Sequence, residues 1–115
     1  MSQKKIIVID DEPTVCEAIR MILTVDRHII ETFTDPRKAA EYAMANDWDI
    51  VFLDLQMPHM HGLAMAELLK GRYPKKPIVT VAARTLVPTQ ANVDRALLKP
   101  FGVQELRQAI LDLAP

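Results

Sequence analysis

The chain alternates between short, fully apolar runs and longer stretches in which apolar residues recur at helical spacing. Residues 6–9 are four consecutive aliphatics, and residues 49–53 form a similar run. A strand that is apolar at every position is buried on both faces, as in a parallel sheet covered by helices. The pattern therefore predicts an α/β fold, a three-layer sandwich around a five-stranded parallel sheet.

The expected elements follow one another with little interruption. Strands are predicted at residues 6–9, 29–33, 49–53, 78–81 and 96–98. Helices are predicted over residues 13–23, 36–44, 63–73 and 103–113. Pro13 and Pro36 suit the first turn of a helix, and Asp35 is a good cap before the second one. Alternation of this kind implies right-handed crossovers and one domain over residues 1–115.

One segment, residues 83–95, interrupts this alternation of strand and helix patterns. It carries Pro88 near its middle and shows little apolar periodicity. Because proline interrupts a helix interior, a full helix is not expected there. The fourth crossover is predicted to be shortened or to lack its helix.

The composition narrows the classes of function. The chain has 115 residues, a net charge of −1, half of its residues apolar and a quarter charged, as in an ordinary globular domain. No basic face is visible that would bind nucleic acid directly, and no apolar run approaches the roughly 20 residues that span a membrane. The one cysteine, Cys16, has no internal partner. These features favour a cytoplasmic protein.

Charged residues follow three of the predicted strands. Asp10 and Asp11 come after the first, Asp54 after the third and Lys99 after the fifth. The carboxyl ends of parallel strands meet at one edge, so these side chains should converge. Three carboxylates need a cation, and Mg²⁺ prefers such oxygen ligands. A carboxylate beside Mg²⁺ and an ammonium group is suited to attack on phosphorus, so Asp54 is predicted to become an aspartyl phosphate.

In these motifs the sequence resembles the receiver domain of response regulators in two-component signalling. The resemblance extends through the chain and is carried by the Asp10-Asp11 pair, Asp54 with Met57, Pro58 and Gly62 behind it, and the triplet Lys99-Pro100-Phe101. It implies a flavodoxin-like fold. It also implies a phosphohistidine donor on a sensor histidine kinase or phosphotransfer protein.

The resemblance assigns roles residue by residue. Asp54 would be the phosphoacceptor and Lys99 would bind the phosphoryl oxygens, with a cis bond to Pro100. Asp11, Asp54 and the backbone carbonyl of Gln56 would bind Mg²⁺, and Asp10 would be an outer-shell partner. The Gln56 side chain and Arg84 stand at two variable positions that tune the lifetime of the phosphoryl group in the family.

The sequence also departs from the family at two positions that move during signalling. Ala82 stands where the family has a threonine or serine hydroxyl, and Ala96 stands where it has an aromatic residue. Thr80 should share the side of Ala82 but lie about 7 Å along the strand, too far to replace the hydroxyl. The phosphorylation chemistry is therefore expected to be complete, while its transmission is in doubt.

Three classes of function fit these observations to different degrees. The first is a phosphorylatable signalling receiver without enzymatic turnover beyond self-phosphorylation and self-dephosphorylation, acting on an unidentified output protein, with homodimer formation as a further alternative. The second is a constitutive interaction module of receiver fold. The third, an aspartate-nucleophile phosphatase, is disfavoured because Gln56 occupies the place of its second acid.

Overall fold

The computed structural model describes residues 3–57, 62–82 and 92–115 of the chain. Five strands and four helices lie within these ranges. The elements in chain order are β1 (Lys5–Ile9), α1 (Pro13–Val25), β2 (Ile29–Phe33), α2 (Pro36–Ala45), β3 (Ile50–Asp54), α3 (Gly62–Arg72), β4 (Ile78–Ala82), β5 (Arg95–Leu98) and α4 (Val103–Leu113). β3 and β4 each extend one residue beyond the predicted end, so that Asp54 and Ala82 are the last residues of their strands.

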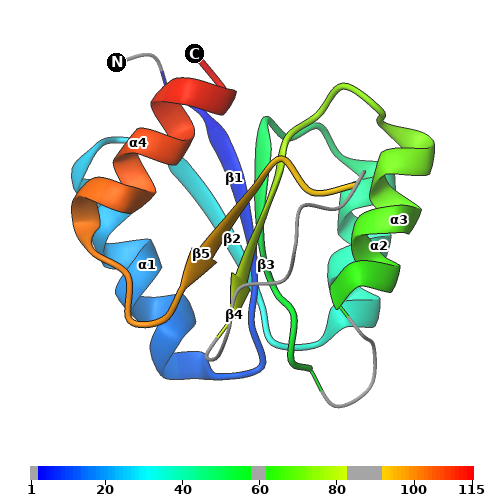
Figure 1. Cartoon of the computed structure of the whole chain (residues 1–115), viewed down its shortest axis with the longest axis horizontal. Helices are drawn as coiled ribbons and strands as arrows, with labels where there is room; N and C mark the ends of the chain where they lie inside the picture. The colour runs from blue at the N-terminus through cyan, green and yellow to red at the C-terminus, as the bar shows by residue number, and fades with distance from the viewer. Residues whose placement is uncertain (1–2, 58–61, 83–91) are drawn as a thin grey trace.

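The five strands form one parallel sheet in the order β2-β1-β3-β4-β5. Helices α1 and α4 cover one face of this sheet, and α2 and α3 cover the other (Figure 1). The strands all end at the same edge, which lies at the bottom of that view. The predicted three-layer α/β sandwich is thereby confirmed.

The sheet divides the core into two halves, and β1 contributes side chains to both. Ile6 and Val8 belong to the cluster under α1 and α4, whereas Ile7 and Ile9 belong to the cluster under α2 and α3. Each of these side chains is about 1% exposed. Full burial of an aliphatic side chain stabilises the fold by about 1.5–3 kcal/mol. The continuous apolar run follows from burial on both faces.

The same alternation determines which side of the sheet the polar residues at the strand ends face. Phe52, two residues before Asp54, packs under α1 and α4. Val8, two residues before Asp10, packs in the same cluster. Because residues two apart in a strand share a face, both carboxylates leave the sheet on the side of α1.

Local signals at the helix starts agree with the sequence reading. The Asp35 carboxylate accepts a hydrogen bond from the Arg37 amide at 2.9 Å, and Pro36 opens α2. At α4, the Gly102 amide donates to Glu105 at 3.0 Å. Such bonds satisfy amides that have no partner within the first helical turn. The Lys99–Pro100 peptide bond is cis, as the resemblance implied.

The expected shortening of the fourth crossover concerns residues 83–91, which lie outside the described ranges. The four helices found in the rest of the chain are consistent with it.

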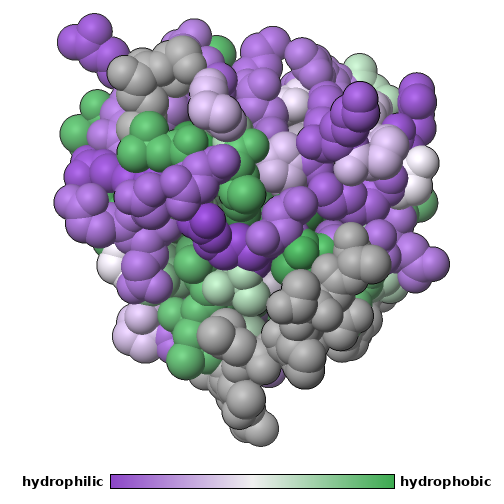
Figure 2. Space-filling view, turned by 45° about the horizontal axis from the view of Figure 1, so that its top comes forward, coloured by the Kyte–Doolittle hydropathy of each residue, from purple (hydrophilic) through white to green (hydrophobic). Residues whose placement is uncertain are grey.

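One face of the domain is mainly hydrophilic. Figure 2 shows a face on which hydrophilic residues predominate and apolar residues lie between them in separate groups. Among the described residues, the exposed large apolar side chains are Met21, Val25, Ile29, Leu68, Leu98, Val103 and Leu111. Among the helices of the described ranges, none has the length and apolarity needed to cross a membrane.

Candidate functional site

The candidate site stands at the carboxyl edge of the sheet, where β1, β3 and β5 end. Asp10 follows β1, Asp54 ends β3 and Lys99 follows β5. In the sheet order, β4 separates β3 from β5, so Asp54 and Lys99 start about 10 Å apart in backbone position. The Lys99 amide donates to the Ala82 carbonyl at 2.7 Å, which fixes the base of the lysine beside the tip of β4.

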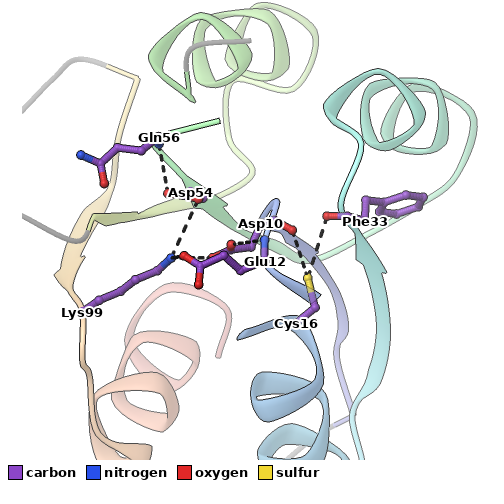
Figure 3. Close-up of polar contacts among 7 residues, drawn as sticks. All are labelled: Asp10, Glu12, Cys16, Phe33, Asp54, Gln56 and Lys99. Atoms are coloured by element: carbon purple, nitrogen blue, oxygen red, sulfur yellow. Dashed lines mark hydrogen bonds and ion pairs between the residues drawn. The ribbon is translucent and has the colours of Figure 1, made fainter. Parts of the chain in front are cut away.

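The Lys99 ammonium reaches back across the edge to three carboxylates (Figure 3). Its Nζ lies 2.9 Å from Asp10 Oδ2 and 3.9 Å from Asp54 Oδ2. A third carboxylate, that of Glu12, lies 3.6 Å away. The Asp10 and Asp54 side chains are each only 3% exposed, so these charges interact with little screening by water. The predicted convergence of acids and lysine is confirmed for Asp10, Asp54 and Lys99.

Each buried carboxylate is also held by a backbone amide two residues further along the chain. Asp10 Oδ1 accepts from the Glu12 amide at 2.9 Å. Asp54 Oδ1 accepts from the Gln56 amide at 3.0 Å. These local turns are typical of aspartate and fix the orientation of both side chains. One oxygen of each carboxylate therefore faces the chain, and the other faces Lys99.

The Asp54 carboxyl has an unusual proton affinity. Burial raises its pKa from 3.8 to about 6, and the neighbouring Asp10 charge and a hydrogen bond with Asp11 act in the same direction. The Gln56 amide and the Lys99 ammonium oppose this rise without cancelling it. Desolvation disfavours the charged form of a carboxyl group. The positive groups around Asp54 therefore do not fully offset the cost of burying its ionised form.

Lys99 responds in the complementary way. Burial alone would lower the pKa of the Lys99 ammonium, but the hydrogen bond and charge of Asp10 outweigh it. The charges of Asp54 and Glu12 add to that effect, and the net pKa is raised. Lys99 is therefore positively charged at neutral pH.

The residues present fit a hard divalent cation. Ligand atoms of Asp10, Asp11 and Glu12 all lie within 4.8 Å of one another. Carboxylate oxygens are the donors that Mg²⁺ selects, usually with one or two carboxylates and several waters. Together with the raised pKa of Asp54, this donor set suits a cation placed between the end of β1 and Asp54.

Glu12 is the site residue that the sequence reading missed. It follows the acidic pair directly and precedes Pro13. An acid at that point is easily taken as part of a helix start, because the first turn favours negative charge. The available signal was its adjacency to Asp11, but the contact with Lys99 depends on the tertiary fold.

A close backbone contact fixes the tip of β3. Gly62, the first residue of α3, lies so near that a Cβ atom on it would stand 2.6 Å from the Asp54 carbonyl oxygen. It would also stand 2.6 Å from the Leu55 Cα. Real Cβ atoms essentially never come that close to backbone atoms, so only glycine allows this approach. Gly62 therefore lets α3 begin directly against the residue that carries the carboxylate.

The two altered positions lie on neighbouring strands. Ala82 pairs with Leu98, and Ala96 pairs with Thr80. Ala82 is buried at the end of β4. Thr80 is also buried and pairs with Leu53, one residue before the level of Asp54. Its hydroxyl therefore lies two residues below the β4 tip, and Ala82, the last described residue of β4, carries no hydroxyl.

The other expected tuning position, Arg84, lies outside the described residues, as does Pro58 of the loop motif. Gln56 lies just beyond β3 with an exposed side chain, and Figure 3 shows that side chain turned away from Lys99. Its amide holds Asp54, as described above.

Comparison with known sequences gives a consistent answer. A model of the response regulator receiver domain matches residues 6–111. Response regulator MprA of Mycolicibacterium vanbaalenii is 32% identical over 107 residues, which cover 89% of this chain and 46% of MprA. The transcriptional regulatory protein KdpE of Mycobacterium tuberculosis is 33% identical over 105 residues, which cover 87% of this chain and 46% of KdpE. The chain thus spans just under half the length of these relatives.

Solved structures agree on the fold. The response regulator TrrA from Thermotoga maritima, solved in complex with Mg(2+)-BeF, superposes with a TM-score of 0.89 at 25% identity, covering 96% of this chain and 99% of TrrA. A CheY-like receiver domain protein from Methanospirillum hungatei JF-1 gives a TM-score of 0.88 at 18% identity, covering 96% and 93%. The latter likeness shows the fold alone.

The sequence match covers most of the chain, and the parallel sheet has the expected acids and lysine at its carboxyl edge. The chain belongs to the family of response regulator receiver domains.

Proposed function

We propose that this receiver domain accepts a phosphoryl group on Asp54 from a phosphohistidine, with Mg²⁺ bound beside it. The observation that carries the proposal is the buried Asp54 carboxylate, which has one oxygen turned to a charged lysine and an acidic cluster nearby. This arrangement holds a nucleophile and charge-neutralising groups in fixed positions, which is most of what phosphoryl transfer requires.

In the transfer, an Asp54 oxygen attacks phosphorus while the bond between phosphorus and the donor's histidine nitrogen breaks. The electron pair of that bond stays on the imidazole nitrogen, which takes a proton from solvent. Lys99 is placed to bind a phosphoryl oxygen, because its ammonium lies 3.9 Å from the Asp54 carboxylate. Asp10 keeps this ammonium charged and oriented.

The bound metal would neutralise charge on the phosphoryl oxygens. Asp11, Asp54 and the Gln56 carbonyl are proposed as its ligands, and Asp10 as an outer-shell partner. The Gln56 side chain and Arg84 are proposed to tune the lifetime of the phosphoryl group.

The domain is proposed to be phosphorylated once per signal rather than to turn over a substrate. Receiver domains are signalling modules. Around Asp54, the described residues include no second acid on the phosphoacceptor's own loop, since Gln56 stands there. The proposed donor is a sensor histidine kinase or phosphotransfer protein in the cytoplasm. The proposed output partner is a protein, and a homodimer is an alternative assembly.

A specific observation supports a second candidate function. Ala82 and Ala96 leave no hydroxyl at the β4 tip and no aromatic side chain on β5. A receiver of this kind could be phosphorylated without passing a change to its surface. It would then act as a constitutive interaction module.

The test exposes the protein to Mg²⁺ with acetyl phosphate, and in parallel to Mg²⁺ with beryllofluoride, a phosphoryl mimic. Wild type should gain the mass of one phosphoryl group, and Asp54→Asn should gain none. Asp35→Asn, which retains a helix cap on α2, is the matched control and should behave as wild type. Absence of modification and of beryllofluoride binding in wild type would refute the proposal.

The same samples separate the two candidate functions. Amide spectra that change only near residues 10–12 and 54–56 upon beryllofluoride binding favour the constitutive module. Changes that extend along β5 and α4 favour the switch.

A further inference from the structure

Glu12 occupies the position before α1, yet its side chain does not cap that helix. Glutamate is not among the residues preferred there, where short side chains accept a bond from the first turn. The Glu12 carboxylate lies instead on the side of the site, with Oε1 3.6 Å from Lys99 Nζ (Figure 3). Helix formation therefore does not account for the direction of this side chain.

Lys99 is shared unequally among its three carboxylates. Asp10 is nearest at 2.9 Å, Glu12 follows at 3.6 Å, and Asp54 is farthest at 3.9 Å. Asp10 and Glu12 both belong to the segment that joins β1 to α1. Since the attraction between charges falls with their separation, the segment after β1 holds the ammonium more strongly than the phosphoacceptor does.

The two holding acids differ in how firmly they are placed. Asp10 is buried and bonded to an amide. The Glu12 side chain is 60% exposed, and its carboxylate forms an ion pair with Lys99. A longer, more exposed side chain can release the ammonium at small cost.

We propose that Glu12 is a positioning residue that holds Lys99 toward β1 in the unphosphorylated domain and so slows phosphorylation of Asp54. The inference rests on the proposed role of Asp54 as phosphoacceptor. When a phosphoryl group arrives, Lys99 leaves Glu12 for the phosphoryl oxygens. A variant without the Glu12–Lys99 contact does not have to break this competing interaction during phosphorylation.

Two substitutions separate the contact from the charge. Glu12→Gln removes the charge and weakens the contact. Glu12→Asp keeps the charge, but its side chain is one methylene shorter and falls outside the roughly 4 Å reach of an ion pair. Glu17→Gln is the matched control, because Glu17 lies on α1 with a similar side-chain exposure of 65% and pairs with Arg20 instead.

The measurement is the phosphorylation rate with acetyl phosphate at saturating Mg²⁺, so that changes in metal affinity do not enter. Glu12→Gln and Glu12→Asp should both be about two- to fivefold faster than wild type, the range of an exposed ion pair. Glu17→Gln should match wild type. In a Lys99→Ala background, Glu12→Gln should have no effect, which a double-mutant cycle tests.

Wild-type rates in Glu12→Asp would mean that charge alone acts, and would overturn the proposal. So would a full effect of Glu12→Gln in the absence of the Lys99 side chain, or rates at or below wild type in both Glu12 variants.

A second readout uses the metal-free protein and does not depend on phosphorylation. The NMR signal of the methylene next to the Lys99 ammonium, at one fixed pH, should move in both Glu12 variants and stay in place in Glu17→Gln. An unmoved signal overturns the positioning role by itself. If wild type is neither phosphorylated nor bound by beryllofluoride, the role of Asp54 fails instead, and the two failures are distinguishable.

Discussion

The end of β3 and the end of β4 lie side by side in the sheet but are built very differently. At the β3 end, Asp54 is buried, bonded to the Gln56 amide and turned toward Lys99. At the β4 end, Ala82 offers only a methyl group, and Ala96 lies on β5 opposite Thr80, two residues before Ala82. The first region holds buried charges in fixed positions, whereas the last described residue of β4 is a buried alanine.

The difference teaches that accepting a phosphoryl group and reporting it make separate demands on a fold. Acceptance needs preorganised charge, which strengthens electrostatic interactions because little reorganisation is required. Reporting needs an element with two arrangements that the modification biases. In this chain, the contacts of Asp54 with the Gln56 amide and with Lys99 provide such preorganised charge. Ala82 has no hydroxyl with which to meet the second demand.

The largest expected effect comes from removing the positive charge of the accepting side. Lys99→Ala leaves Asp10 and Asp54 buried without their ammonium partner. Phosphorylation by acetyl phosphate should fall about 10²–10³-fold, and the free energy of unfolding should fall by about 3–5 kcal/mol. Denaturant unfolding and intact mass check the two losses.

The control is Lys76→Ala, whose ion pair with the exposed Asp47 lies away from the site. It also loses contacts with two aromatic rings, so about 1–2 kcal/mol is expected without any loss of phosphorylation. Equal effects of the two lysines would contradict the special role of the Lys99 charge beside Asp54.

The next effect tests the backbone contact that fixes Asp54. Gly62→Ala places a Cβ atom 2.6 Å from the Asp54 carbonyl oxygen, so the β3 tip or α3 must shift. We expect a loss of about 1–3 kcal/mol in stability and slower phosphorylation. Gly71→Ala is the control, because nothing lies within 4 Å of its added Cβ.

Gly71→Ala should leave phosphorylation unchanged and stabilise the helix by about 0.5–1 kcal/mol. Unfolding curves and phosphorylation rates of the two alanine variants give the comparison. If Gly62→Ala kept wild-type stability and rate, the close contact would have no bearing on the site.

The raised pKa of Asp54 predicts a pH dependence in metal-free buffer. The folded state holds a proton on Asp54 up to about pH 6, whereas the unfolded chain releases it near 3.8. Between these values the folded state binds more protons, so this group's contribution to stability falls as pH rises from about 4 to 6. The loss should be roughly 1–3 kcal/mol.

Asp54→Asn should lack this loss, and the difference between its stability and that of wild type over pH 4–7 isolates the effect. Mg²⁺ should offset part of the loss above pH 6, stabilising wild type by about 1.4 kcal/mol at ten times its dissociation constant. A flat difference curve would contradict the burial argument.

The smallest effect on phosphorylation itself is expected from substitutions on the reporting side. Ala82→Thr combined with Ala96→Tyr returns a hydroxyl and an aromatic ring to the two strands. Added bulk at the buried Ala82 should cost about 1–3 kcal/mol. In return, beryllofluoride should change amide signals along β5 and α4 more widely than it does in wild type.

Val81→Thr is the control for this pair of substitutions, because Val81 points to the opposite face of β4 from Ala82. It should add no such spread of signals. If wild type already shows the full spread, the β4 tip is dispensable for reporting, and the contrast between the two strand ends disappears.

Much of the fold could be predicted because its signals are local. The apolar runs of β1 and β3 indicated strands buried on both faces, and Pro13, Asp35 and Pro36 marked helix starts. The strand ends shifted by only one residue, at Asp54 and Ala82. These features depend on spacing and residue type, which the sequence contains directly.

The sequence by itself determined which groups meet at the site. Because all strands run parallel, acids after β1 and β3 and a lysine after β5 must share one edge. It also determined what is missing at Ala82 and Ala96, since no fold can supply an absent hydroxyl.

Only the tertiary structure decided how the charges are distributed. The unequal sharing of Lys99, the involvement of Glu12 and the raised pKa of Asp54 depend on distances of a few ångströms and on burial. Electrostatic energies change steeply over such distances when water is excluded, and sequence order does not fix them. The reach of Lys99 across β4 to the acids after β1 is therefore a property of the folded domain.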